Sequence, residues 1–314
     1  MNEKEWIKYL KKYLYEKKPV FKSTNEDCGV IKISKTKYLL LTTDALVENI
    51  HFKFDYTSYF DLGAKLAASN LSDIAAMGGE PKWALLTLGS PSPINPYWID
   101  PLMEGLVSTL KKYGAYLIGG DTVKSSTFFI NLTLIGETKN PILRKGAIPG
   151  DLIFVSKPLG ESAAFLRLIK TFNLKEIPQN IKKAHLTPEP EIILGKELSK
   201  KKLATSMIDI SDGLLLDLWR ICEENEVGAE LYQEKIPIGK GATFEEALSG
   251  GEDYALLFTV SSQNLYEIPK LTKKLKKEIF NIGKIITEKK LFLIDKNQKK
   301  EIKPLGFDHF KKGA

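Results

Sequence analysis

Apolar and polar positions in the first half of the chain alternate between a short and a long period. Short apolar runs rich in β-forming residues predict three strands, at 38–42, 83–88 and 128–135. Apolar side chains at helical spacing predict two helices between them, one at 61–79 that ends at a double glycine and one from Trp98 to Leu110. Strands and helices in alternation indicate an α/β or α+β fold.

The apolar pattern lapses at 137–151, where Pro and Gly cluster, and this predicts a domain boundary. The second half then repeats the alternation, with strands predicted at 152–156, 206–210 and 254–260 and helices at 162–170 and 214–225. At 314 residues the chain exceeds the usual size of one domain. We therefore predict two α/β domains, 1–137 and 138–314, each with its own core, that meet at a cleft.

The formal net charge is +7, from 46 Lys and Arg against 39 Asp and Glu. The lysines occur as scattered pairs among Glu and apolar residues, which is typical of solvated helix faces, so we expect no nucleic-acid partner. Two distant cysteines, Cys28 and Cys222, predict neither a disulfide framework nor a zinc module. Residues 1–18 predict a charged amphipathic helix, and no apolar run is long enough to span a bilayer. We expect a cytoplasmic protein with no membrane partner.

Aspartates lie where predicted strands end or begin, in the segments Thr42-Thr43-Asp44, Gly119-Gly120-Asp121, Asp209-Ile210-Ser211-Asp212 and Gly251-Glu252-Asp253. Asp27 lies in a polar turn before another strand, and Asp73 lies inside a helix that is otherwise apolar or small. Mg²⁺ binds hard oxygen ligands together with phosphate oxygens, and adjacent glycines let backbone N–H groups approach phosphates. Any one of these motifs, taken alone, is better explained as turn or cap chemistry. Together they favour a Mg²⁺–polyphosphate site, and Asp73 favours it most because an unpaired carboxylate is costly to bury.

Common signatures of other enzyme classes are absent from the sequence. There is no P-loop, no Gly-x-Gly-x-x-Gly turn, no His-Arg-Asp catalytic loop and no Gly-x-Ser-x-Gly elbow. The three histidines, His51, His185 and His309, are too far apart in sequence to predict a histidine metal centre. These absences narrow the kinds of nucleotide site that the chain could form.

These motifs, in this order, resemble the thiamine-monophosphate kinase family, within the superfamily of aminoimidazole ribonucleotide synthetase and selenophosphate synthetase. The resemblance spans nearly the whole chain, through EDC (26–28), TTDALVENIHF (42–52), NLSDIAAMGGEP (70–81), LIGGDT (117–122), RKGAIPGD (144–151), HLTPEP (185–190), IDISDGLLLDL (208–218), SGGEDYALLF (249–258) and GFDHF (306–310). It implies transfer of the γ-phosphate of ATP to thiamine monophosphate, with several Mg²⁺ ions, in a homodimer that pairs its N-terminal sheets.

The resemblance also implies roles for single residues. Metal ligands would be Asp27, Thr42, Thr43, Asp44, Asp73, Asp121, Asp209 and Asp212, of which Asp44, Asp121 and Asp212 are the expected catalytic residues. ATP would contact Gly120, Asp121, Arg144, Ser211 and Tyr113. Thiamine monophosphate would contact His51, Glu252 and Phe307, with its cationic ring beside the carboxylate and the aromatic side chain.

The chain departs from the family pattern at two places. Its first turn reads Asn25-Glu26-Asp27-Cys28-Gly29 where the family commonly has Gly-Asp-Asp-Cys-Ala, so only Asp27 carries over, and Cys28 is expected to be a buried small residue. Glu191 stands where the family usually has Arg, so no anion-binding role is expected there. Two alternatives remain: another ATP-using member of the superfamily, and a basic nucleic-acid-binding or nucleotide-sensing protein without turnover.

Overall fold

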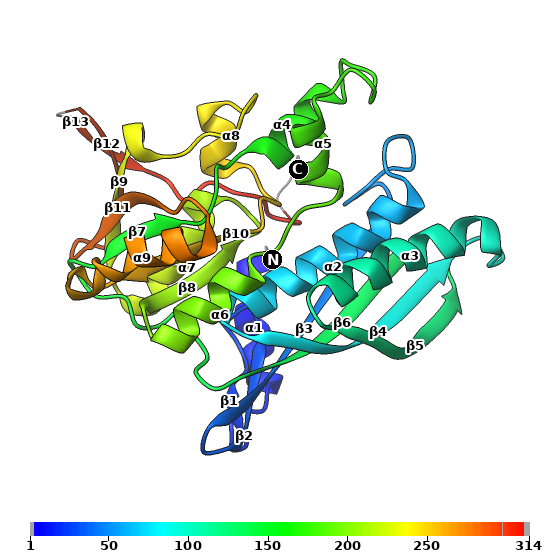
Figure 1. Ribbon diagram of the computed structural model, residues 1–314, viewed down its shortest axis with the longest axis horizontal. Coiled ribbons are helices and arrows are strands. Elements are labelled where there is room, and N and C mark those ends of the chain that lie inside the picture. The colour runs from blue at the N-terminus through cyan, green and yellow to red at the C-terminus, as the bar shows by residue number, and fades with distance from the viewer. Residues whose placement is uncertain (1–2, 297, 311–314) are drawn as a thin grey trace.

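Two mixed β-sheets with helices packed on them make up the chain (Figure 1), as a computed structural model shows for residues 3–296 and 298–310. The mixed α/β class predicted from the sequence is confirmed. Among the described helices, none is long and apolar enough to cross a membrane.

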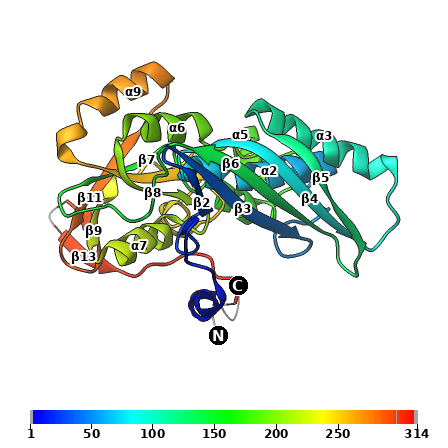
Figure 2. The same ribbon diagram turned by 90° about the horizontal axis from the view of Figure 1, so that it is seen from below.

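The first half of the chain forms a six-stranded sheet in the order β1-β2-β3-β6-β4-β5. Its strands are β1 (Val20–Lys22), β2 (Gly29–Ser34), β3 (Lys37–Val47), β4 (Glu80–Ser90), β5 (Tyr116–Lys124) and β6 (Phe129–Thr138). Its helices are α1 (Glu3–Leu10), the 3-10 helix η1 (Lys11–Tyr13), α2 (Tyr59–Ala76) and α3 (Pro96–Lys112). Helices α2 and α3 cover one face of this sheet, and β5 lies at its edge (Figure 2).

The second half forms a seven-stranded sheet in the order β13-β12-β9-β11-β7-β10-β8. Its strands are β7 (Leu152–Val155), β8 (Ala204–Ile210), β9 (Gly228–Tyr232), β10 (Ala255–Val260), β11 (Phe280–Ile286), β12 (Leu291–Asp295) and β13 (Gln298–Ile302). Its helices are α4 (Glu161–Leu168), α5 (Gln179–Leu186), α6 (Ile192–Lys201), α7 (Leu214–Asn225), α8 (Phe244–Ser249), α9 (Glu267–Leu275) and the short η2 (Gln233–Lys235) and η3 (Ser262–Asn264). Residues 139–151, where the boundary was predicted, join β6 to β7 without helix or strand.

Helix α2 lies between the two sheets and contacts both of them (Figure 1). Leu66, Leu71 and Ile74 of this helix belong to the same buried cluster as Met207 and Phe258 of the second sheet. The prediction of a separate core for each half is therefore wrong in part. A second cluster does lie within the C-terminal half, but the largest one spans both halves because α2 has apolar side chains on both sides.

Helix α6 approaches α2 closely through a glycine. A Cβ atom added at Gly195 would lie 2.1 Å from the carbonyl oxygen of Ala75, so the backbone of one helix would have to shift. Gly105 plays the same part on α3, where a Cβ atom would lie 2.0 Å from the carbonyl oxygen of Phe60. Both neighbours of α2 therefore pack against it backbone to backbone.

Most predicted elements are present, with longer strands than the apolar runs indicated. Strand β3 continues past Thr42 to Val47, and β5 continues past Ile118 to Lys124. Both extensions are paired along their length, with Asp44 opposite Leu132 of β6 and Asp121 opposite Thr87 of β4. The prediction that these aspartates follow the ends of strands is therefore wrong, because pairing with a neighbouring strand continues through the polar residues.

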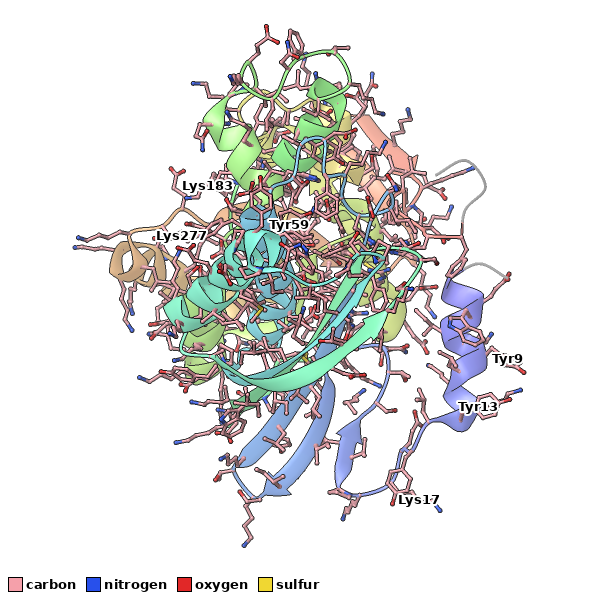
Figure 3. The ribbon with its side chains drawn as sticks, turned by 90° about the vertical axis from the view of Figure 1, so that its right-hand side faces the viewer. Tyr9, Tyr13, Lys17, Tyr59, Lys183 and Lys277 are labelled. Carbon is pink, nitrogen blue, oxygen red and sulfur yellow. The ribbon has the colours of Figure 1, made fainter. Side chains whose placement is uncertain are left out.

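The amphipathic pattern at residues 1–18 forms less helix than predicted. Helix α1 ends at Leu10, a single 3-10 turn follows to Tyr13, and residues 1–2 lie outside the described part of the chain. Figure 3 shows α1 at the periphery of the molecule, with Tyr9 and Tyr13 directed outward. Both side chains are exposed, at 43% and 68%.

The close contact of α6 with α2 predicts the effect of a single methyl group. Gly195→Ala should lower the free energy of unfolding by about 1–3 kcal/mol, even though alanine favours helix, because its Cβ would meet the Ala75 carbonyl. Chemical denaturation would measure the change. Lys200→Ala, an exposed position on the same helix, is the control and should change the stability by less than about 0.5 kcal/mol. Equal stability of Gly195→Ala and wild type would contradict this packing.

Candidate active site

Three aspartates from distant parts of the chain meet beside the second half of α2. Carboxylate oxygens of Asp27, Asp73 and Asp209 all lie within 4.8 Å of one another. Asp27 comes from the turn before β2, Asp73 from the last turn of α2 and Asp209 from the end of β8. The two sheets thus each deliver a carboxylate to the helix that lies between them.

Hydroxyl groups hold these carboxylates in place. The Thr42 hydroxyl donates to Asp73, and the Ser72 hydroxyl donates to Asp209 over 2.6 Å. Asp44 faces the same helix and accepts a hydrogen bond from the Ser69 side chain. Thr42 and Asp44 share one face of β3 because side chains alternate along a strand.

The carboxylates repel one another in a buried setting. Burial raises the pKa of Asp44 to about 6, and the nearby charges of Asp212 and Asp27 add to that rise. The pKa values of Asp73 and Asp209 are also raised, first by burial and then by neighbouring aspartates. Oδ2 of Asp27 is buried and has no hydrogen-bond partner among the described residues. Crowded carboxylates with a free buried oxygen fit a divalent cation, which would supply the missing positive charge.

Two arginines border this group on the side of α7. Arg144 is ion-paired with Asp27, and its backbone N–H donates to Glu26 over 2.8 Å. Arg220 of α7 contacts Asp212 at 2.6 Å and Asp217 at 2.5 Å. The positive charges of Arg144 and Arg220 therefore neutralise the aspartates along one edge of the group.

The turn that carries Ser211 and Asp212 is fixed by backbone hydrogen bonds. Oδ2 of Asp217 accepts the N–H groups of Ser211, Asp212 and Gly213 over 3.1–3.2 Å. The carbonyl of Ser211 accepts the N–H of Glu252 over 2.7 Å. The predicted ATP contact at Ser211 and the predicted substrate contact at Glu252 are therefore joined directly.

A second group of predicted residues gathers around Glu252. The N–H of Phe307 donates to the carbonyl of Asp212 over 2.9 Å, which brings the C-terminal segment back to the site. The ring of Phe307 lies 4.7 Å from that of His309, which lies 5.1 Å from that of His51. His51 accepts the Val47 N–H on Nδ1 over 3.0 Å, and the charge of Glu252 acts on its pKa, which burial lowers. His51, Glu252 and Phe307 thus lie in one region of the structure, and their contact with a common substrate stays a prediction.

Four predicted residues lie apart from the aspartate group. The hydroxyl of Thr43 lies on the opposite face of β3 from Thr42, beside Asn131 and Thr133. Tyr113 ends α3, and Gly120 and Asp121 lie in β5, the edge strand that is separated from β3 by β6 and β4. Three strand spacings amount to about 14 Å, so Asp121 does not join the other aspartates of its own chain.

Several residues of the site escaped the sequence analysis. Lys65 and His185 are buried beside Glu252, and Asp217 and Arg220 support the turn at Asp212. Lys65 could have been found from the sequence, because it is a charged residue inside an otherwise apolar helix, the same signal that singled out Asp73. Asp217 and Arg220 had none, because an acidic and a basic residue three positions apart on an amphipathic helix are typical of a solvated surface.

Glu26 and Glu191, two residues at which the chain departs from the family pattern, each have a partner in the structure. Glu26 accepts the backbone N–H of Arg144 over 2.8 Å. Glu191 is buried and ion-paired with Lys277 of the C-terminal half. Cys28 is buried at 3% exposure, as expected for a small core residue. Two hollows of about 270 and 230 Å³ lie beside α5 and are lined by residues such as Lys175, Lys183 and Glu189, and neither is lined by Asp27, Asp73 or Asp209.

Known proteins resemble the chain along its whole length. Residues 25–138 match the AIR synthase related protein, N-terminal domain, and residues 149–296 match the corresponding C-terminal domain. Thiamine-monophosphate kinase from Buchnera aphidicola subsp. Acyrthosiphon pisum is 40% identical over 96% of this chain and 97% of its own length. The enzyme of that name from Haemophilus influenzae is 37% identical over 99% of this chain and 98% of its own.

A solved structure supports the same assignment. The structure titled AaThiL complexed with AMPPCP and TMP has a TM-score of 0.86 and 31% identity, and the match covers 98% of this chain and 97% of that one. The resemblance seen in the sequence motifs is thereby confirmed. The chain belongs to the thiamine-monophosphate kinase family of AIR synthase related proteins.

Proposed function

We propose that the protein transfers the γ-phosphate of ATP to thiamine monophosphate in the cytoplasm and yields thiamine diphosphate and ADP. The observation that carries this proposal is the meeting of Asp27, Asp73 and Asp209 from both halves of the chain within 4.8 Å. The names of the relatives and the ligands of the AaThiL structure support the choice of substrates. Residues 1–137 and 138–314 would be the two domains that build the site.

Mg²⁺ would be held by the aspartates of this group, with Asp44 and Asp212 at its border. The raised pKa values of Asp44, Asp73 and Asp209 reflect burial and unbalanced negative charge, which a divalent cation would relieve. Bound Mg²⁺ supplies neutralisation of the triphosphate, which lowers the barrier to attack by a second anion. Arg144 and Ser211, at the edge of the group, would contact the nucleotide.

The transfer itself requires positioning more than proton chemistry. An oxygen of the acceptor phosphate forms a bond to the γ-phosphorus while the bond between that phosphorus and the β–γ bridging oxygen breaks, and ADP leaves. The acceptor oxygen is already anionic, so no residue has to remove a proton from it. Alignment in line and neutralisation of charge therefore account for catalysis. His51, Glu252 and Phe307 would hold the thiamine portion of the acceptor.

A homodimer would explain the isolated position of Asp121. Strand β5 and its neighbour β4 expose Trp83, Leu85, Tyr116 and Ile118, each at 41–61%. An apolar sheet edge of this kind favours pairing with a second copy. We propose that pairing through β5 places Tyr113, Gly120 and Asp121 at the nucleotide of the partner subunit.

The proposed activity predicts turnover that depends on the aspartate group. With Mg²⁺, ATP and thiamine monophosphate, the wild type should form thiamine diphosphate, and Asp44→Asn should lower kcat at least 100-fold because it removes a metal-binding charge. Asp100→Asn, on the exposed side of α3, is the matched control and should retain full activity. Product formation measured by chromatography tests both. Turnover of another acceptor, or nucleic-acid binding without ADP release, would favour the alternative functions.

Without bound divalent metal, the ionised Asp44 carboxylate should lower the free energy of unfolding. The folded pKa of about 6 lies above the unfolded value, so the folded protein loses stability as the pH rises through this range. In EDTA at pH 8, Asp44→Asn should therefore be more stable than wild type by about 1–3 kcal/mol, and the difference should shrink towards pH 4. Urea denaturation at the two pH values measures this. A difference that is independent of pH would show that charge is not its cause.

The proposed dimer predicts complementation between two inactive variants. Asp44→Asn and Asp121→Asn chains, each inactive alone, should regain activity when co-expressed, because one of the two sites in a mixed dimer contains both intact aspartates. Purification through two different affinity tags isolates the mixed dimer, which should show about half of wild-type activity. Ile118→Asp should convert the wild type to monomer in light scattering. Mixed dimers as inactive as their parents would place Asp121 outside the partner's site.

A further inference from the structure

Lys65 is a buried cation that the proposed roles above do not use. It lies in the second turn of α2, and its side chain is 1% exposed, among the largest fully buried side chains of the described chain. A buried ammonium group is costly unless its hydrogen bonds are satisfied and its charge is balanced. Its partners therefore indicate what the group is for.

The ammonium group of Lys65 has three acceptors, which matches its three hydrogens. It lies 2.8 Å from Oε1 and 2.9 Å from Oε2 of Glu252, so it contacts both carboxylate oxygens. The third contact is Nε2 of His185 at 3.4 Å. These three contacts join α2 of the first half to the loop of Glu252 and to helix α5 of the second half. The two contacts with Glu252 prevent its carboxylate from rotating.

His185 orients Lys65 and has a defined tautomer. Because an ammonium group only donates, Nε2 of His185 must accept, and the ring hydrogen must lie on Nδ1. Nδ1 lies 2.9 Å from the Ser162 hydroxyl and 3.3 Å from Oε2 of Glu252. The imidazole is stacked on Phe165 at 4.6 Å, and burial together with the Lys65 charge lowers its pKa to about 3. It therefore remains neutral at any physiological pH.

Glu252 is held by its backbone as well as by Lys65. Its φ angle is +62°, a conformation that residues other than glycine rarely adopt. Its N–H donates to the backbone carbonyl of Ser211. Burial would raise the pKa of its carboxyl, but the charge and the hydrogen bond of Lys65 hold this pKa below its ordinary value. With 24% of the side chain exposed, Glu252 remains reachable from the side of His51.

We propose that Lys65, oriented by His185, is a positioning residue that fixes the Glu252 carboxylate in one orientation for recognition of the phosphate acceptor. The inference rests on the proposed function, because it assigns Glu252 to the thiamine side of the site. Lys65 acts through Glu252 and does not contact the substrate. Its charge also partly balances that carboxylate, so Glu252 serves as a directional hydrogen-bond acceptor.

Replacement of the charge alone tests this role. Lys65→Met keeps the length and most of the volume of the side chain but removes the ammonium group. The KM for thiamine monophosphate should rise at least tenfold, whereas the KM for ATP should stay within twofold of wild type. Equal changes in both constants would indicate a general structural defect, and an unchanged KM for thiamine monophosphate would show that Glu252 needs no positioning. Either result would overturn the inference.

A matched lysine controls for the loss of an ion pair between the two halves. Lys196 of α6 contacts Glu80 of β4 at 2.8 Å, and their side chains are 43% and 49% exposed. Lys196→Met should leave both KM values within twofold of wild type. A rise for Lys196→Met equal to that for Lys65→Met would attribute the effect to the joint between the halves and overturn the role of Lys65.

A double variant shows whether Lys65 acts through Glu252. The KM for thiamine monophosphate of Lys65→Met/Glu252→Gln should equal that of Glu252→Gln within twofold, and a further tenfold rise would mean direct action by Lys65. The neutral pair leaves no unbalanced charge, so this comparison remains available if Lys65→Met alone does not fold. Failure of the wild type to form thiamine diphosphate would reject the proposed function before any variant is compared. An active wild type with an unaffected Lys65→Met would reject the present inference alone.

Discussion

The burial of α2 between two sheets is the constraint on which the rest of the structure depends. A helix that packs on both sides needs apolar side chains nearly all round, and a polar group that it carries is costly to bury without a partner inside the protein. Lys65 pairs with Glu252, Ser69 with Asp44, and Ser72 with Asp209. Since the partners come from both halves of the chain, the same burial that unites the core also assembles the site.

Assembly of this kind carries an energetic cost in the aspartate group. The pKa values of Asp44, Asp73 and Asp209 are raised because burial and mutual repulsion both disfavour their charged forms. A core selected for stability alone would have apolar residues at these positions. The apolar contacts of α2 with both sheets offset the repulsion, so the strain is confined to the place where a cation would relieve it.

The sequence predicted the elements better than it predicted the surroundings of each polar residue. Helix α7 was placed to the residue, at 214–225, because its apolar period is regular and its ends are marked. The position of Asp44 within β3 was missed, since strand pairing through a polar stretch depends on β6, which lies far along the chain. Motif order grouped Asp121 with the other aspartates, whereas the sheet order separates them. Order along a chain records which motifs are present but not the distance between them.

The spacing of charges along α2 relates the two ends of the proposed site to each other. Lys65 and Asp73 are eight residues apart, which places them on one stripe of the helix at a separation of about 12 Å along its axis. Lys65 fixes the Glu252 side, where the acceptor would be recognised, and Asp73 belongs to the group that would hold the phosphates. Because an α-helix is rigid over two turns, this distance does not vary with the motion of loops. In the proposed site, a single buried helix would therefore set the separation between the place where the acceptor is recognised and the place where the phosphate is transferred.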